Sequence, residues 1–167
     1  MPSPDRMSAE QSPRSFCPIG LARGQGLADH YAQENELNLH FVELLNAFRR
    51  SGGLARVPEV ASRFQAYGTN DVSPLMRWIN SRQVINFDWQ GKQWMPLFQF
   101  DPVGLSLRAG LSNVLDELRG VCDNWELATW FARPNPWLGE LIPAEMLAVA
   151  APQVLNAARA ERFMATG

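Results

Sequence analysis

The stretch RWINSRQVINFDWQGKQWMPLFQFD, residues 77–101, decides the fold, because it holds three of the six tryptophans and the clearest hairpin pattern. Apolar side chains alternate with others on both sides of a Gln-Gly-Lys turn: Ile85, Phe87 and Trp89 before it, and Trp94, Pro96, Phe98 and Phe100 after it. This period of two predicts two antiparallel strands with one aromatic face to bury. Pro96 cannot donate to a strand ladder, so we expect the second strand to be at an edge or bulged there. A lone hairpin is marginal in water, so helices must cover the aromatic face.

Composition bounds the class of protein. A chain of 167 residues allows one domain with a tail, or two very small domains. The two cysteines, Cys17 and Cys122, form no CxxC pair, and the chain has only two histidines as further possible zinc ligands. This composition favours neither a disulfide framework nor a zinc site. The N-terminus lacks an apolar leader, and no run reaches about 18 apolar residues. We therefore expect a reduced, cytoplasmic setting, with no secretion and no membrane span.

Charge is distributed unevenly along the chain. The net charge is −2, but residues 49–108 carry eight basic and four acidic side chains, a sum of +4, between segments that each sum to −3. A positive middle between acidic ends is consistent with a nucleic-acid footprint. Ordinary surface charge with a small fluctuation explains it equally well.

The residues before the hairpin divide into three segments. Residues 1–28 are rich in Pro and Ser without periodicity, which predicts a disordered or draped tail. Residues 29–53 contain an amphipathic helix, expected from about residue 35 to 50, with an apolar stripe of Leu37, Phe41, Leu44, Leu45 and Phe48. His40 flanks this stripe and is interpreted as a helix-surface histidine.

Residues 54–100 read as a helix-turn-helix-like unit followed by the hairpin. One helix is expected over residues 58–66, and Ser73 and Pro74 begin another as N-cap and first residue, with Leu75, Trp78 and Ile79 inward. Two short helices feeding a hairpin follow the order of a DNA-binding helix-turn-helix with a wing. The connection between them is longer than usual, and any three-helix packing unit gives the same pattern.

Residues 101–167 form a helical C-terminal region. A stripe of Leu107, Leu111, Val114, Leu115 and Leu118 predicts one helix, and Asp123 with Glu126 forms a capping-box start for the next. Pro134-Asn135-Pro136 ends that helix, and Pro143 and Pro152 each begin a further short one. The fold class expected is mainly α with one β-hairpin, a compact bundle of short helices packed on the aromatic face of the hairpin.

Two strings carry a family resemblance. The string W-x-P-x-F-Q-F-D at residues 94–101 and the run WELATWFARPNPWLG at residues 125–139, with the later prolines, resemble antitoxins of the MbcA/ParS/Xre type. The likeness spans roughly residues 54–163, and this chain has Glu140-Leu141-Ile142 where the family often has a Gly-Gly-Arg-like run.

The resemblance implies a function and its residues. In that family the C-terminal helical region binds a toxin, usually a RES-type toxin that consumes cellular NAD, and an upstream helix-turn-helix often represses the operon. The motif positions that would bind the partner are Trp130, Asn135, Pro136, Leu138, Gly139 and Pro143. Arg77, Asn80, Arg82 and Lys92 are the positions that would face operator DNA, and a homodimer is expected by analogy alone.

Several of the same residues also have a purely structural interpretation. Buried tryptophans remove large areas from water, so all six are interpreted first as core, and Asn135 between two prolines serves equally well to fix a turn through its side chain. The leading hypothesis is an antitoxin-like protein that occludes a toxin through its C-terminal helices and also represses its operon. The alternative is a DNA-binding regulator that uses the basic segment 49–108 without a toxin partner. No nucleophile–base pair, metal set or phosphate loop is recognisable, so we expect no enzyme, cofactor or metal.

Overall fold

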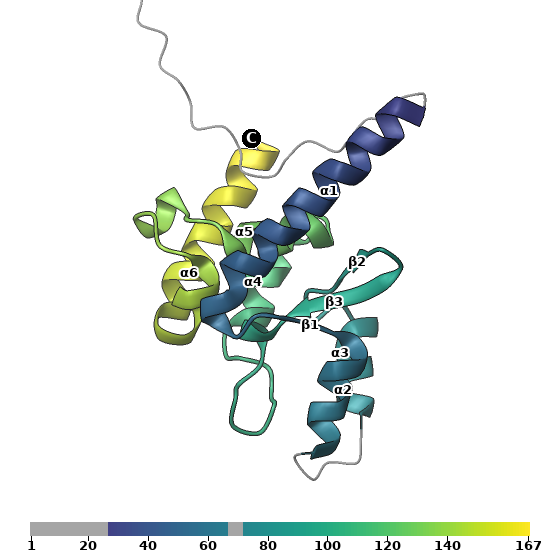
Figure 1. Cartoon of the computed structure of the whole chain (residues 1–167). Helices are drawn as coiled ribbons and strands as arrows, with labels where there is room; N and C mark the ends of the chain where they lie inside the picture. Colours follow the sequence, from purple (N-terminus) through teal and green to yellow (C-terminus); the bar gives the residue numbers. More distant parts are fainter. Residues whose placement is uncertain (1–26, 67–71) are drawn as a thin grey trace, which may run out of the picture.

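The computed structural model describes residues 27–66 and 72–167 (Figure 1). The elements follow one another as α1 (Leu27–Ala47), η1 (Phe48–Ser51), β1 (Leu54–Arg56), α2 (Val57–Ala66), α3 (Ser73–Asn80), β2 (Phe87–Trp89), β3 (Lys92–Pro96), η2 (Leu97–Gln99), α4 (Leu111–Leu118), α5 (Asn124–Ala132), η3 (Pro136–Leu138) and α6 (Pro143–Thr166). The fold is mainly helical with a small antiparallel sheet, which confirms the predicted class. Most of the predicted tail, residues 1–26, lies outside the described residues, and α1 already begins at Leu27.

The hairpin forms as predicted, but it belongs to a three-stranded sheet. β2 pairs with β3 through Phe87 opposite Trp94, and β1 pairs with the other side of β3 through Leu54 opposite Pro96. The order β1-β3-β2 makes β3 the central strand, so the prediction that Pro96 marks an edge strand is wrong. Pro96 is tolerated because it is the last residue of β3.

A glutamine side chain replaces the ladder contacts that Pro96 cannot make. Extending the β2–β3 register by two residues places Ile85 opposite Pro96, which has no N–H to offer the Ile85 carbonyl. Instead the Gln99 Nε2 donates to Ile85 O at 3.0 Å and to Pro96 O at 2.9 Å, and Gln99 Oε1 accepts from Ile85 N. Gln99 is fully buried, so all three contacts are shielded from water. The short helix η2 supplies this glutamine where continuous strand was expected through residue 100.

The sheet buries both of its faces, rather than the single aromatic face expected. On one face a large cluster contains Phe87 with the apolar sides of α1, α4, α5 and α6, and on the other a smaller cluster contains Met95 with α2 and α3. Figure 1 shows these two groups of helices on opposite sides of the sheet. The helix-helix-hairpin order is therefore real, but α1 is separated from α2 and α3 by the sheet.

The first helix is longer than predicted, and its N-terminal half projects beyond the body (Figure 1). Phe41, Leu44 and Phe48 of the predicted stripe are buried, whereas Leu37 is exposed. Leu37 is exposed because it lies in the part of α1 that extends beyond the surface against which the rest of the helix packs.

The C-terminal helices largely follow their prolines and caps. The capping box of α5 is present, with Glu126 N donating to Asp123 Oδ1 at 2.8 Å and Asp123 N to Glu126 Oε2 at 2.7 Å. The two predicted helices at Pro143 and Pro152 are both present as the two halves of α6, separated by a kink at Ala150, which has non-helical geometry two residues before Pro152. The helix expected from Leu107 begins only at Leu111 in the structure.

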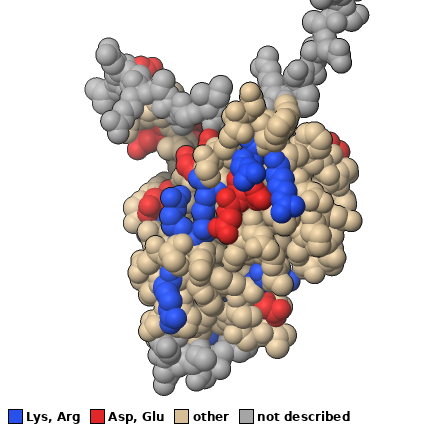
Figure 2. Space-filling model, turned by 180° about the vertical axis from the view of Figure 1, so that it is seen from behind, with Lys and Arg blue, Asp and Glu red and all other residues tan. Residues whose placement is uncertain are grey.

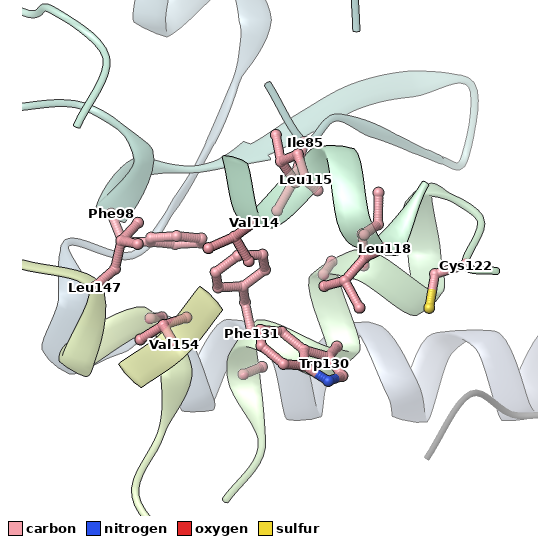
Figure 3. Packing of buried hydrophobic residues seen from close by; sticks show 14 of the residues in the cluster. Ile85, Phe98, Val114, Leu115, Leu118, Cys122, Trp130, Phe131, Leu147 and Val154 are labelled. Carbon is pink, nitrogen blue, oxygen red and sulfur yellow. The ribbon is translucent and has the colours of Figure 1, made fainter. Parts of the chain in front are cut away.

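Aromatic and aliphatic side chains from α4, α5 and α6 meet in the main core (Figure 3), where Phe131 lies between Val114 and Val154. Five of the six tryptophans are buried or half-buried, as expected for core residues, whereas Trp137 is 54% exposed. Cys122 is buried in the same cluster, and Cys17 lies outside the described residues. No helix in the described ranges has the length and apolar character to span a membrane.

Candidate functional site: the 134–141 loop

The 134–141 loop is held from its base by a buried helix. α5 is buried along most of its length, from Leu127 to Ala132, and ends where Arg133 turns extended ahead of Pro134. A proline disfavours helical geometry in the residue before it, so the chain must leave α5 here. The exit point of the loop is therefore fixed by both packing and covalent geometry.

Asn135 closes the loop through four hydrogen bonds. Its backbone N donates to Leu141 O at 3.0 Å, and its backbone O accepts from Leu138 N at 2.9 Å and Glu140 N at 3.0 Å. Its side-chain Oδ1 accepts from Trp137 N at 2.9 Å and caps η3. Asn135 is buried, so water does not compete for these contacts. The interpretation of Asn135 as a residue that fixes a turn through its side chain is confirmed.

Two consecutive residues of the loop are left-handed. Gly139 has φ of 64° and Glu140 has φ of 66°. Glycine adopts this conformation without penalty, but a glutamate does not, so Glu140 stores strain that the surrounding hydrogen bonds must offset. Such backbone strain is concentrated at functional sites, where a fixed shape matters more than stability.

The closed loop presents apolar side chains to solvent. Trp137 and Leu141 are each half or more exposed, at 54% and 50%. An aromatic ring held on a rigid turn loses little entropy when it enters a partner's pocket, and tryptophan is enriched at binding hot spots. The loop therefore has the chemistry of a protein-contact element.

The six predicted partner-binding residues divide into two groups. Trp130, Asn135, Leu138 and Pro143 are buried, so they position the loop from beneath, whereas Pro136 and Gly139 are exposed on it. Sequence reasoning missed Trp137 and Leu141 as contact residues because both were assigned to apolar packing. The local sequence carries no signal for this, because the exposure of Trp137, at the variable position of the Pro-Asn-Pro-Trp-Leu-Gly run, depends on which distant elements reach it.

The four predicted DNA-facing residues are all exposed. Arg77, Asn80 and Arg82 lie on or just after the last turn of α3, where Arg82 is left-handed with φ of 55° and donates its N–H to Ile79 O at 3.1 Å. Lys92 lies on a separate element, at the start of β3.

A third arginine, Arg119, interacts with this group from the end of α4. Burial lowers the pKa of Arg119; the negative charge of Asp116 opposes this effect, and the positive charge of Arg82 adds a smaller lowering. Arg119 Nη1 lies 3.6 Å from Asp116 Oδ1, so the repulsion between the two guanidinium groups is partly offset within the protein. The face opposite to that of Figure 1 shows basic and acidic side chains side by side (Figure 2). Glu117 is paired with both Arg159 and Arg162.

His40 lies between α1 and α5 rather than on an open helix surface. Its Nε2 is 2.9 Å from Thr129 Oγ1, and its ring contacts that of Trp125. Burial lowers its pKa, with a smaller lowering by the charge of Arg133 that outranks the raising effect of Glu43. The histidine is therefore a neutral packing and hydrogen-bonding group at neutral pH.

Comparison of the chain with protein-family models, characterised proteins and solved structures gives no match. Within the described residues no three His, Cys, Asp or Glu side chains are grouped to hold a metal ion.

Proposed function

We propose that this chain is an antitoxin-like protein that binds a partner toxin through its C-terminal helices and occludes it, with the 134–141 loop as the central contact. The observation that carries the proposal is the exposed Trp137 on a turn that Asn135 fixes with four hydrogen bonds. By resemblance the partner is a RES-type toxin that consumes NAD, and occlusion means that the loop and its surroundings block the substrate entrance. An interface of about 1,600 Å² in total is sufficient for stable association.

The residues of the loop have separate roles in this proposal. Trp137 and Leu141 enter the partner, whereas the buried Asn135, Leu138 and Trp130 set the height and angle of the turn. Truncating a central aromatic anchor typically costs about 2 kcal/mol or more of binding free energy, equivalent to a rise of about 30-fold in Kd. Replacing Asn135 would weaken binding in a different way, because the Trp137 ring would remain but the hydrogen bond that fixes its backbone would be lost.

Co-expression with the neighbouring open reading frame tests the proposal. If the product of the neighbouring open reading frame is toxic, the wild-type chain is expected to restore growth and the Trp137→Ala variant is expected not to restore it. The wild-type protein and the variant are expected to unfold at the same temperature. Leu39→Ser is the matched control, because Leu39 is a 68% exposed apolar residue on α1, a different element. A neighbour that is not toxic, a toxic one that wild-type chain does not neutralise, or full neutralisation by Trp137→Ala would each count against the proposal.

A second candidate function is repression through DNA, in the antitoxin or in a regulator without a toxin partner. It is supported by the exposure of Arg77, Asn80 and Arg82 at one end of α3 and by the nearby Arg119. Binding to the upstream operator should weaken by about 0.9 log unit per phosphate contact for each tenfold rise in salt. The double variant Arg77→Ala/Arg82→Ala should reduce both affinity and salt slope, and Arg133→Ala, an exposed arginine on the opposite side of the sheet, should change neither. Operator binding that survives the double variant unchanged would exclude this face.

A further inference from the structure

A groove distinct from the 134–141 loop opens between α2, η1, η2, the 101–108 segment and the start of α6. Its volume is about 510 Å³, within the range of about 300–1,000 Å³ typical of small-ligand sites. Its lining includes the buried apolar side chains of Val60, Phe98 and Phe100 and the half-buried one of Leu97. It shares no residue with the loop proposed to bind the toxin.

Three arginines line the same groove, and they are not equally neutralised. Arg50 is paired with Glu145, with Nε to Oε1 at 3.6 Å. Among the residues that the structure describes, no carboxylate lies within 4.0 Å of the guanidinium of Arg63 or Arg108. Asp101, the other acid of the lining, keeps its negative charge while its Oδ1 accepts from Val103 N at 2.8 Å, and none of the ion pairs among the described residues joins it to an arginine of the groove. Two guanidinium groups therefore remain available to an anion.

Arg108 is pre-positioned for such a contact. Its Nε donates to Phe98 O at 2.8 Å and its Nη2 to Phe100 O at 3.3 Å. These bonds hold the planar guanidinium at the groove without cancelling its charge, since carbonyl groups carry none. A fixed guanidinium loses little entropy on binding and matches the oxygens of a carboxylate, sulfonate or phosphate.

We propose that this groove binds a small organic anion with an apolar body, its acid group between Arg63 and Arg108 and its body over Phe98 and Phe100. The apolar floor excludes a bare inorganic ion as the preferred ligand, because such an ion leaves that surface in contact with water. Arg63 and Arg108, which have no carboxylate within 4.0 Å in the described structure, favour an anionic ligand over a neutral apolar one. A ligand here touches both hydrophobic clusters, since Phe98 belongs to one and Phe100 to the other.

Fluorescence titration with 8-anilinonaphthalene-1-sulfonate tests the proposal, because this probe combines an apolar body with a single anionic group. The neutral N-phenyl-1-naphthylamine is its uncharged counterpart. Arg63→Gln removes a positive charge at an exposed position that makes no ion pair within 4.0 Å in the described structure and only a longer-range electrostatic interaction with Glu59, so the fold should be retained. We expect saturable binding of the anionic probe, weakened at least fivefold by Arg63→Gln, while the Kd of the neutral probe is the same in both proteins.

Three controls separate the groove from other apolar surfaces. Arg133→Gln, an exposed arginine outside the groove, should leave the Kd of the sulfonate unchanged, and Trp137→Ala should also leave it unchanged. Ala148→Phe, which fills the groove from α6, should abolish saturable binding of both probes. Unchanged sulfonate affinity in Arg63→Gln, or retained binding in Ala148→Phe, would overturn the proposal.

Discussion

Replacing Gln99 by Met should destabilise the protein more than any other single polar-to-apolar exchange on the sheet. Methionine has nearly the length and shape of glutamine, so the substitution removes hydrogen bonds without opening a cavity. Three bonds are lost, two of them to the backbone of Ile85 and one to Pro96 O. No strand can replace them, because the residue opposite Ile85 is a proline.

The magnitude follows from the groups left without partners. Ile85 and Pro96 are buried, so one N–H and two carbonyls lose their partners away from water. An orphaned buried group costs about 1–3 kcal/mol, and burial of the more apolar methionine returns about 1–2 kcal/mol. A net loss of about 3 kcal/mol is expected, out of a total stability of about 5–15 kcal/mol for a domain.

Urea denaturation followed by tryptophan fluorescence measures this loss. With an m value of about 2 kcal/mol per molar, within the usual range, the midpoint should fall by about 1.5 M. Gln93→Met is the matched control, because Gln93 is exposed on β3 and should change stability by less than about 0.5 kcal/mol. A loss below about 1 kcal/mol for Gln99→Met, or equal losses for both variants, would refute the account of how the ladder is completed past Pro96.

Three further outcomes are expected. Because the pKa of His40 in the folded protein lies below its value in the unfolded chain, the unfolded state binds more protons as pH falls through about 6.5. The urea midpoint should therefore fall between pH 7.5 and 5.5, and His40→Gln, but not the exposed His30→Gln, should flatten that fall. Gly110→Ala should lower thermal stability by about 1–3 kcal/mol, since φ is 83° and the added Cβ would lie 2.8 Å from the Cβ of Ala151; a melting temperature equal to wild type would contradict this. Asp123→Ala should cost about 1 kcal/mol in the same assay by removing the capping box of α5, and no loss would show that packing alone fixes that helix start.

The elements that could be predicted from the sequence are those with a local signal. The hairpin follows from alternation about a glycine turn, and the start of α5 and the kink before Pro152 follow from capping and proline chemistry. β1 was missed because three residues carry no period, and its pairing partner β3 lies about 40 positions away. Once β1 was missed, the edge position of Pro96 and the single buried face followed as errors.

The same distinction, between local signals and contacts with distant segments, applies to the candidate site. Asn135 could be recognised from its position between two prolines, because the turn that it closes is local. The exposure of Trp137 could not, because burial depends on which distant elements reach a residue. The groove that contains Arg63 and Arg108 could not be predicted either, since it joins residues from four separate parts of the chain.

The residues that carry the family resemblance are mostly buried, so the resemblance concerns how the chain folds more than which surface it presents to a partner. Gln99, Asn135, Leu138 and Pro143 are all buried, so the shared motif specifies how the hairpin and the loop are built. Recognition depends on what those buried residues leave outside, and here that is Trp137 together with the 140–142 segment, where the chain differs from the family pattern. Under the proposed function, a partner toxin should therefore present a pocket for an indole ring, and transplanting the exposed loop residues alone should transfer partner choice, because the buried frame beneath them would stay the same.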